Sequence, residues 1–150
     1  MPSKKIISGV VFCAAILMTS QPALAQQPQQ GFSLVSPFKS EIRTRRLINS
    51  IALDALLTYN YAESDSTYTD WKTHTIPGLR GNRYLMKPVA GGRHTIEIAY
   101  GLNPSGSYQI YVYGQRIEGQ NNVMNPDLAS YKARSEYTVG QENARLATQQ

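Results

Sequence analysis

The sequence predicts an α+β domain, in which one long N-terminal amphipathic helix packs on a small antiparallel meander of three or four strands, with flexible termini. A segment without Gly or Pro, with apolar residues at three- and four-residue spacing, predicts the helix. Alternating apolar and polar segments joined by short turns predict the meander. With 150 residues, 41% of them hydrophobic and 17% charged, the chain is long enough for one such domain.

Residues 1–25 have the pattern of a secretory signal peptide. Lys4 and Lys5 precede an apolar stretch over 6–18, and Ala23-Leu24-Ala25 matches a small-residue cleavage site. The apolar stretch is shorter than the roughly 20 residues that a membrane-spanning helix needs. We therefore expect cleavage after Ala25 and a mature chain without a transmembrane segment.

Cleavage would change the charge and remove Cys13, the one cysteine. Loss of two lysines lowers the 15 basic residues to 13, against 10 acidic ones, so the formal charge falls from +5 to +3. A chain without cysteine has neither a disulfide framework nor a multi-cysteine metal site. Because small exported eukaryotic domains usually carry disulfides, we expect a bacterial protein that is periplasmic or secreted.

The helix has a clear start signal. Residues 26–36 are rich in glutamine and predict a flexible leader, after which Ser36-Pro37 suits a helix N-cap and first position. A single α+β domain is then expected over 37–118. The helix is predicted from Phe38 to about Asn60, and these residues form its apolar face: Leu47, Ile48, Ile51, Ala55 and Tyr59.

Three strands are predicted after the helix, over 83–89, 94–102 and 107–117, with turns at 90–93 and 103–106. Residues 67–76 could add an irregular fourth strand. The last part, 119–150, predicts a loop followed by a short helix over 127–134 or by disorder.

The most informative feature of the strand 107–117 is its tyrosines. If Ile110 and Val112 face the core, the opposite positions form an outward row: Gln109, Tyr111, Tyr113 and Gln115. Tyrosine suits recognition because it offers a large apolar area and a polar tip, although it is also an ordinary strand residue. Together with the nearby Arg83 and Arg93, this row predicts a non-enzymatic binding or assembly module for a protein or another envelope component.

The same strand has little charge and no proline over 107–115. At a sheet edge it could pair with another chain, which would allow self-association or peptide binding, whereas a central position would remove this route. Arginines are clustered at positions 43, 45 and 46, and could meet an anionic partner. The modest mature charge argues against nucleic acid as that partner.

The alternative function is a small secreted hydrolase that uses a histidine with a carboxylate. Its candidate residues are Asp70, His74, His94 and Glu97. The sequence has no paired-histidine metal motif and no G-x-S-x-G nucleophile motif, so neither a metal nor another cofactor is predicted. A hydrolase requires these groups to converge in a cleft, whereas a binding module does not.

Overall fold

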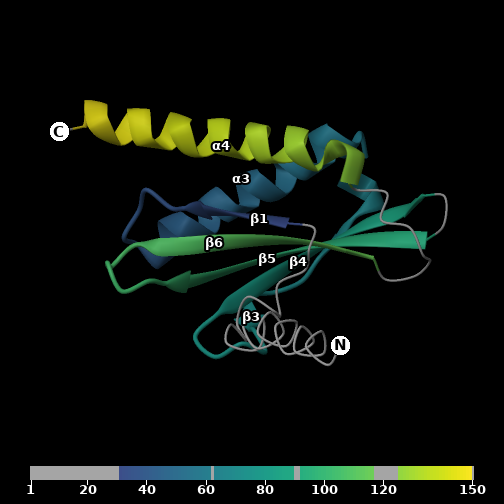
Figure 1. Ribbon diagram of the computed structural model, residues 1–150, viewed down its shortest axis with the longest axis horizontal. Helices are drawn as coiled ribbons and strands as arrows, with labels where there is room; N and C mark the ends of the chain where they lie inside the picture. The colour runs from purple at the N-terminus through teal and green to yellow at the C-terminus, as the bar shows by residue number, and fades with distance from the viewer. Residues whose placement is uncertain (1–30, 62, 90–91, 117–124, 150) are drawn as a thin grey trace, which may run out of the picture.

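The computed structural model describes residues 31–61, 63–89, 92–116 and 125–149. These residues form two α-helices, a 3₁₀ turn and six strands, and both helices lie on the same side of the sheet (Figure 1). The elements follow in this order: β1 Gly31–Val35, α3 Glu41–Tyr59, η1 Glu63–Asp65, β2 Thr67–Tyr68, β3 Lys72–Thr73, β4 Arg80–Val89, β5 Gly92–Leu102, β6 Tyr108–Arg116 and α4 Asn125–Thr148. The predicted α+β class is confirmed.

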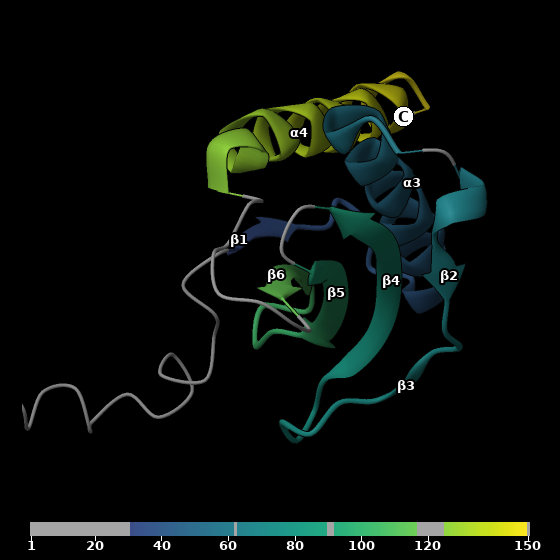
Figure 2. The same cartoon turned by 90° about the vertical axis from the view of Figure 1, so that its right-hand side faces the viewer.

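The sheet is antiparallel, in the order β1-β6-β5-β4-β2, and β3 also pairs with β4. Figure 2 shows how strongly β4 curves below the helices. The register places Arg83 of β4, Glu97 of β5 and Tyr113 of β6 in one row across the sheet. Because side chains alternate along a strand, these three residues lie on one face, which we call the open face. We call the helix-side face the covered face.

The covered face carries the core that the strand alternation predicts. Ile96, Ile98 and Ile110 are completely buried there, and Val112 is 1% exposed. Helix α3 packs on them with Ile48, Ile51, Ala52 and Ala55, all completely buried. The helix begins after Ser40, whose side chain accepts a hydrogen bond from the Arg43 N–H, and ends at Asn60 in the left-handed conformation.

The predicted three- or four-stranded meander and N-terminal helix are wrong in detail, because a strand precedes the helix. Residues 31–35, expected to belong to a flexible leader, form β1 and pair with β6. Leu34 of this strand is 8% exposed, and the Phe32 ring packs edge-on against Tyr131 with centroids 5.1 Å apart. Strand β6 therefore lies between β1 and β5 over residues 109–113, so the route to self-association predicted for an edge strand is removed along this stretch.

Helix α4 is the second difference from the sequence-based expectation. A short helix or disorder was expected after residue 119, but α4 has 24 residues and packs on α3 and β1. Its inward positions recur every three or four residues: Leu128, Tyr131, Ser135, Val139, Glu142 and Leu146. Tyr131 anchors the helix, because its side chain is completely buried and its hydroxyl donates to the Ile51 carbonyl at 3.0 Å.

Candidate functional site: a polar hollow on the open face

The open face is partly covered by residues 69–79, which we call the β3 arm. Between this arm and strands β4 and β5 lies a hollow of about 380 Å³. Its lining is mostly polar and comes from the arm and from the open-face positions of the two strands: Thr69, Asp70, Lys72, Thr73, His74, Thr75, Ile76, Gly81, Arg83 and Glu97. It is therefore built from three segments that are separate in the sequence.

Two strand glycines let the arm approach the sheet. A Cβ atom at Gly101 would lie 2.5 Å from Leu79 Cδ2 and 3.1 Å from the Gly78 carbonyl oxygen. At Gly81 a Cβ atom would lie 3.2 Å from the His74 ring. Gly78 makes the turn with a φ of +86°, a conformation that favours glycine. Glycine inside a strand often marks such a close approach, and here Gly81 and Gly101 leave the space that the arm occupies.

His74 connects the arm to the sheet through Glu97. Its Nε2 lies 3.3 Å from Glu97 Oε1, and the two side chains are only 12% and 16% exposed. Arg83 Nη2 lies 3.7 Å from the other oxygen of Glu97, with an Arg83 side chain that is 52% exposed. Glu97 thus faces a half-exposed cation on one side and a largely covered imidazole on the other.

Both ring nitrogens of His74 have partners within the protein. The Ile76 N–H donates to Nδ1 at 3.3 Å, so Nδ1 carries the lone pair in the neutral ring and Nε2 carries the proton that faces Glu97. A general base in a hydrolase needs a lone pair that faces the substrate. The His74 lone pair instead faces the backbone of its own arm. The geometry therefore suits a residue that holds the arm in place.

The tyrosine row lies on the open face, but it is not uniformly exposed. Tyr113 is only 5% exposed, and its ring centroid is 5.9 Å from that of His74. Burial raises the pKa of Tyr113 above its ordinary value. Tyr111 and Gln109 are half-buried, and the rings of Tyr111 and Tyr113 are parallel, with centroids 6.3 Å apart. Tyr111 rather than Tyr113 is thus the tyrosine that a partner can reach.

The structure brings together residues from both functional hypotheses. Asp70, His74, Arg83 and Glu97 line the hollow, and Tyr113 adjoins it through His74. The side chains of Arg93, His94 and Gln115 lie outside the described residues, although their backbones belong to β5 and β6. Lys72, the threonines of the arm and Gly81 were not predicted as site residues. The signal in the sequence that could have revealed the site is the pair of glycines within strands, Gly81 and Gly101.

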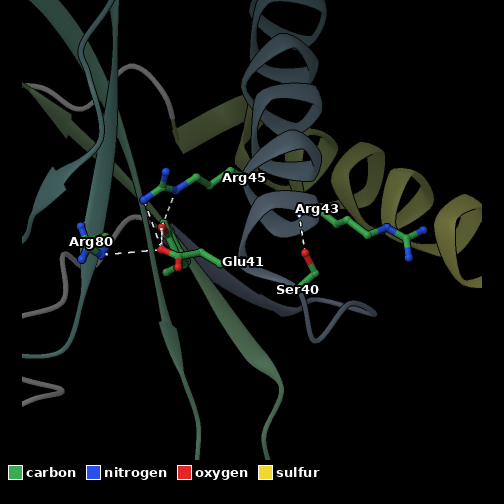
Figure 3. Close-up of polar contacts among 6 residues, drawn as sticks. Ser40, Glu41, Arg43, Arg45 and Arg80 are labelled. Carbon is green, nitrogen blue, oxygen red and sulfur yellow. Dashed lines mark hydrogen bonds and ion pairs between the residues drawn. The ribbon is translucent and has the colours of Figure 1, made fainter.

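A second polar cluster ties the start of α3 to the sheet (Figure 3). Glu41 Oε2 accepts from the Tyr100 hydroxyl at 2.6 Å and lies 3.1 Å from Arg45 Nη2 and 3.7 Å from Arg80 Nε. Arg45 Nε also donates to the Tyr100 hydroxyl at 2.6 Å, and its guanidinium lies 5.4 Å from the Trp71 ring centroid. The Tyr100 hydrogen bond, followed by the two arginines, lowers the pKa of Glu41. Burial and Glu41 raise the pKa of Tyr100 to about 12.

The described ranges contain no group of three or more His, Cys, Asp or Glu side chains that could hold a metal ion. Within the same ranges, no helix combines the length and apolarity needed to cross a membrane. No family model matches the chain, and neither a curated protein nor a solved structure does so.

Proposed function

We propose that this chain is a non-enzymatic binding module of the bacterial cell envelope, and that its contact region is the hollow on the open face together with Tyr111. One observation carries the proposal. Residues from the arm and two strands line a single polar hollow, while the histidine in it has both ring nitrogens engaged by the protein itself. Such a site can bind a ligand but presents no imidazole base to it.

The lining indicates the chemistry of the ligand. Lys72 and Arg83 supply charged donors, and Asp70 and Glu97 supply carboxylate acceptors. The hydroxyls of Thr69, Thr73 and Thr75 can both donate and accept. A half-buried tyrosine on the same face adds an amphipathic surface. This combination fits a polar envelope component with several hydrogen-bonding groups, and it makes an apolar ligand a poor match.

The periplasmic or extracellular location is part of the proposal and rests on the signal-peptide pattern of residues 1–25. These residues lie outside those that the structure describes. N-terminal sequencing of protein recovered from a bacterial periplasm tests this point directly. We expect an N-terminus at Gln26, and an intact N-terminus would contradict the proposed export.

The binding proposal is tested by capture from an envelope extract with an immobilised mature chain. The double variant Arg83→Ala, Tyr111→Ala removes one exposed cation and one tyrosine from the open face. A matched control, Lys132→Ala with Tyr137→Ala, removes the same two chemistries from the exposed side of α4, where these residues are 51% and 68% exposed. We expect the first variant to lose the captured component and the second to retain it. Equal capture by both variants would contradict the proposal.

A hydrolase is the second candidate, because His74 and Glu97 are in contact and Asp70 lines the same hollow. To act as a base, His74 would have to release the Ile76 N–H, which would loosen the arm. Purified protein can be assayed on chromogenic ester, glycoside and phosphoester substrates, with His74→Gln as the comparison. The binding proposal predicts no turnover above that of the variant. Turnover that His74→Gln abolishes would establish the hydrolase instead.

A further inference from the structure

The arginine cluster near the start of α3 is divided between two sides of the helix. Arg45 faces the sheet, where Glu41 and Tyr100 are its partners. Figure 3 shows Arg43 pointing to the opposite side, toward α4. Arg46 follows Arg43 by three residues, so the two side chains are neighbours on the helix surface. The cluster therefore contains one arginine with a structural role and two that project elsewhere.

Arg43 and Arg46 lie across a hollow from Arg145 of α4. All three line a second hollow, of about 230 Å³, between the beginning of α3 and the end of α4. Glu142 is the one acidic residue in this lining, and its carboxylate lies 3.2 Å from Arg145 Nη1. With three cations and one anion, the lining has a formal charge of +2. Within the described ranges, Arg46 has no carboxylate partner.

Contacts within the protein hold two of these arginines in place. The Arg43 guanidinium lies 4.3 Å from the centroid of the Phe38 ring, which is itself only 6% exposed. Glu142 restrains Arg145. Like charges three residues apart on a helix repel each other, whereas the positive end of the α3 dipole and the negative end of the α4 dipole, which both border the hollow, oppose each other. An anion in this hollow would relieve the repulsion.

We propose that this second hollow binds a phosphate group. The guanidinium fork matches phosphate oxygens in a bidentate manner, and several such forks around a small polar hollow are suited to this charge and shape. The group can belong to a soluble phosphate ester or to a phospholipid headgroup, since the recognition chemistry is the same. This site lies between the helices and is separate from the hollow on the open face, so its failure would leave the proposed function unaffected.

Calorimetric titration of the purified protein with inorganic phosphate, at constant ionic strength, tests the site. We expect saturable binding that weakens at least tenfold in the double variant Arg46→Gln, Arg145→Gln. The matched control Lys132→Gln, Arg134→Gln removes the same charge from the exposed surface of α4 and should bind as the unmodified protein does. Thermal unfolding of each variant checks that the fold is intact, as expected for exposed side chains.

A second experiment distinguishes the source of the phosphate group. The protein is floated with vesicles of phosphatidylglycerol, and with neutral phosphatidylcholine vesicles for comparison. Flotation with the anionic vesicles that is lost in Arg46→Gln, Arg145→Gln assigns the site to a lipid headgroup, and calorimetric binding without flotation assigns it to a soluble phosphate. Absence of both, or equal losses in the control variant, would overturn the proposal.

Discussion

The two faces of the sheet use the same strands in different ways. On the covered face, Ile96 and Ile98 of β5 are completely buried against α3, a helix that the sequence specifies by its apolar spacing. Between them, Glu97 points to the open face, where it is 16% exposed because an irregular arm folds over it. Alternation along a strand thus determines the direction of each side chain. It does not determine what will cover that side chain, which depends on distant parts of the chain.

The largest expected effect comes from removing packing on the covered face. Ile98→Ala deletes buried methyl groups from a completely buried position, and we expect the free energy of unfolding to fall by about 2–5 kcal/mol. Gln109→Ala, at a half-buried position on the open face, should change it by less than about 0.5 kcal/mol. Urea unfolding measures both variants. Similar losses of unfolding free energy in the two variants would contradict the view that packing on the covered face contributes more to stability than the open face does.

The second-largest effect is expected where the arm packs on a strand glycine. Gly101→Ala places a Cβ atom 2.5 Å from Leu79 Cδ2 and 3.1 Å from a backbone oxygen, so the arm must move. We expect a loss of about 1–3 kcal/mol, as for overpacking in general. Hydrogen exchange should accelerate at the His74 amide, which donates to the Leu79 carbonyl at 2.7 Å. The amide protons of Ile96 and Ile98 serve as internal controls, and faster exchange there as well would mean that the arm and sheet open together.

A smaller effect is expected from the contact between the arm and Glu97. Glu97→Gln keeps an oxygen that can accept from His74 but removes the charge that faces His74 and Arg83. We expect a loss of about 0.5–1.5 kcal/mol, typical of a weakened hydrogen bond. Glu136→Gln on α4, whose pair with Lys132 spans 4.0 Å at the surface, is the matched control and should cost less. If Glu136→Gln lowers the free energy of unfolding by as much in chemical denaturation, the Glu97 contact contributes no more to stability than a surface ion pair.

The smallest expected effect is a pH dependence of stability, which comes from a carboxylate between α3 and α4. Asp54 of α3 is 8% exposed and accepts from the Thr138 hydroxyl at 2.7 Å, and its burial raises its pKa above the ordinary value. The contribution of Asp54 to stability is therefore fully present below its unfolded pKa and is lost as the pH rises through its folded pKa. Relative to Asp54→Asn, the unmodified protein should become less stable over that interval. A parallel pH profile for both proteins in thermal unfolding would contradict this assignment.

The sequence predicted the elements whose apolar spacing is regular and local. Helix α3 and the inward residues of β5 and β6 belong to this group. Helix α4 was missed because its inward stripe includes Ser135 and Glu142, which obscure the periodicity, and because Gly140 weakens helix propensity. Strand β1 was missed because only five residues form it and its stability comes from pairing with β6, far along the chain.

The candidate site was predictable in its parts but not in its assembly. The sequence singled out Asp70, His74, Arg83 and Glu97, yet assigned them to two competing functions. Their convergence depends on the turn at Gly78 and on the strand register that places Gly81 beneath His74. These are long-range relations, which composition and spacing do not contain. The engagement of both His74 nitrogens, which favours binding over hydrolysis, is likewise a property of the folded arm.

The choice between binding and hydrolysis depends on whether His74 holds the arm to the open face or is available as a base. Long-range ¹H–¹⁵N correlation spectra of the imidazole rings, at a pH where they are neutral, distinguish these two roles, with a His94→Gln variant to assign the signals. We predict that the His74 proton resides on Nε2 and that the Nδ1 shift is that of a hydrogen-bonded acceptor. A proton on Nδ1, or rapid exchange between the two tautomers, would mean that the Ile76 N–H and Glu97 do not hold the His74 ring in place.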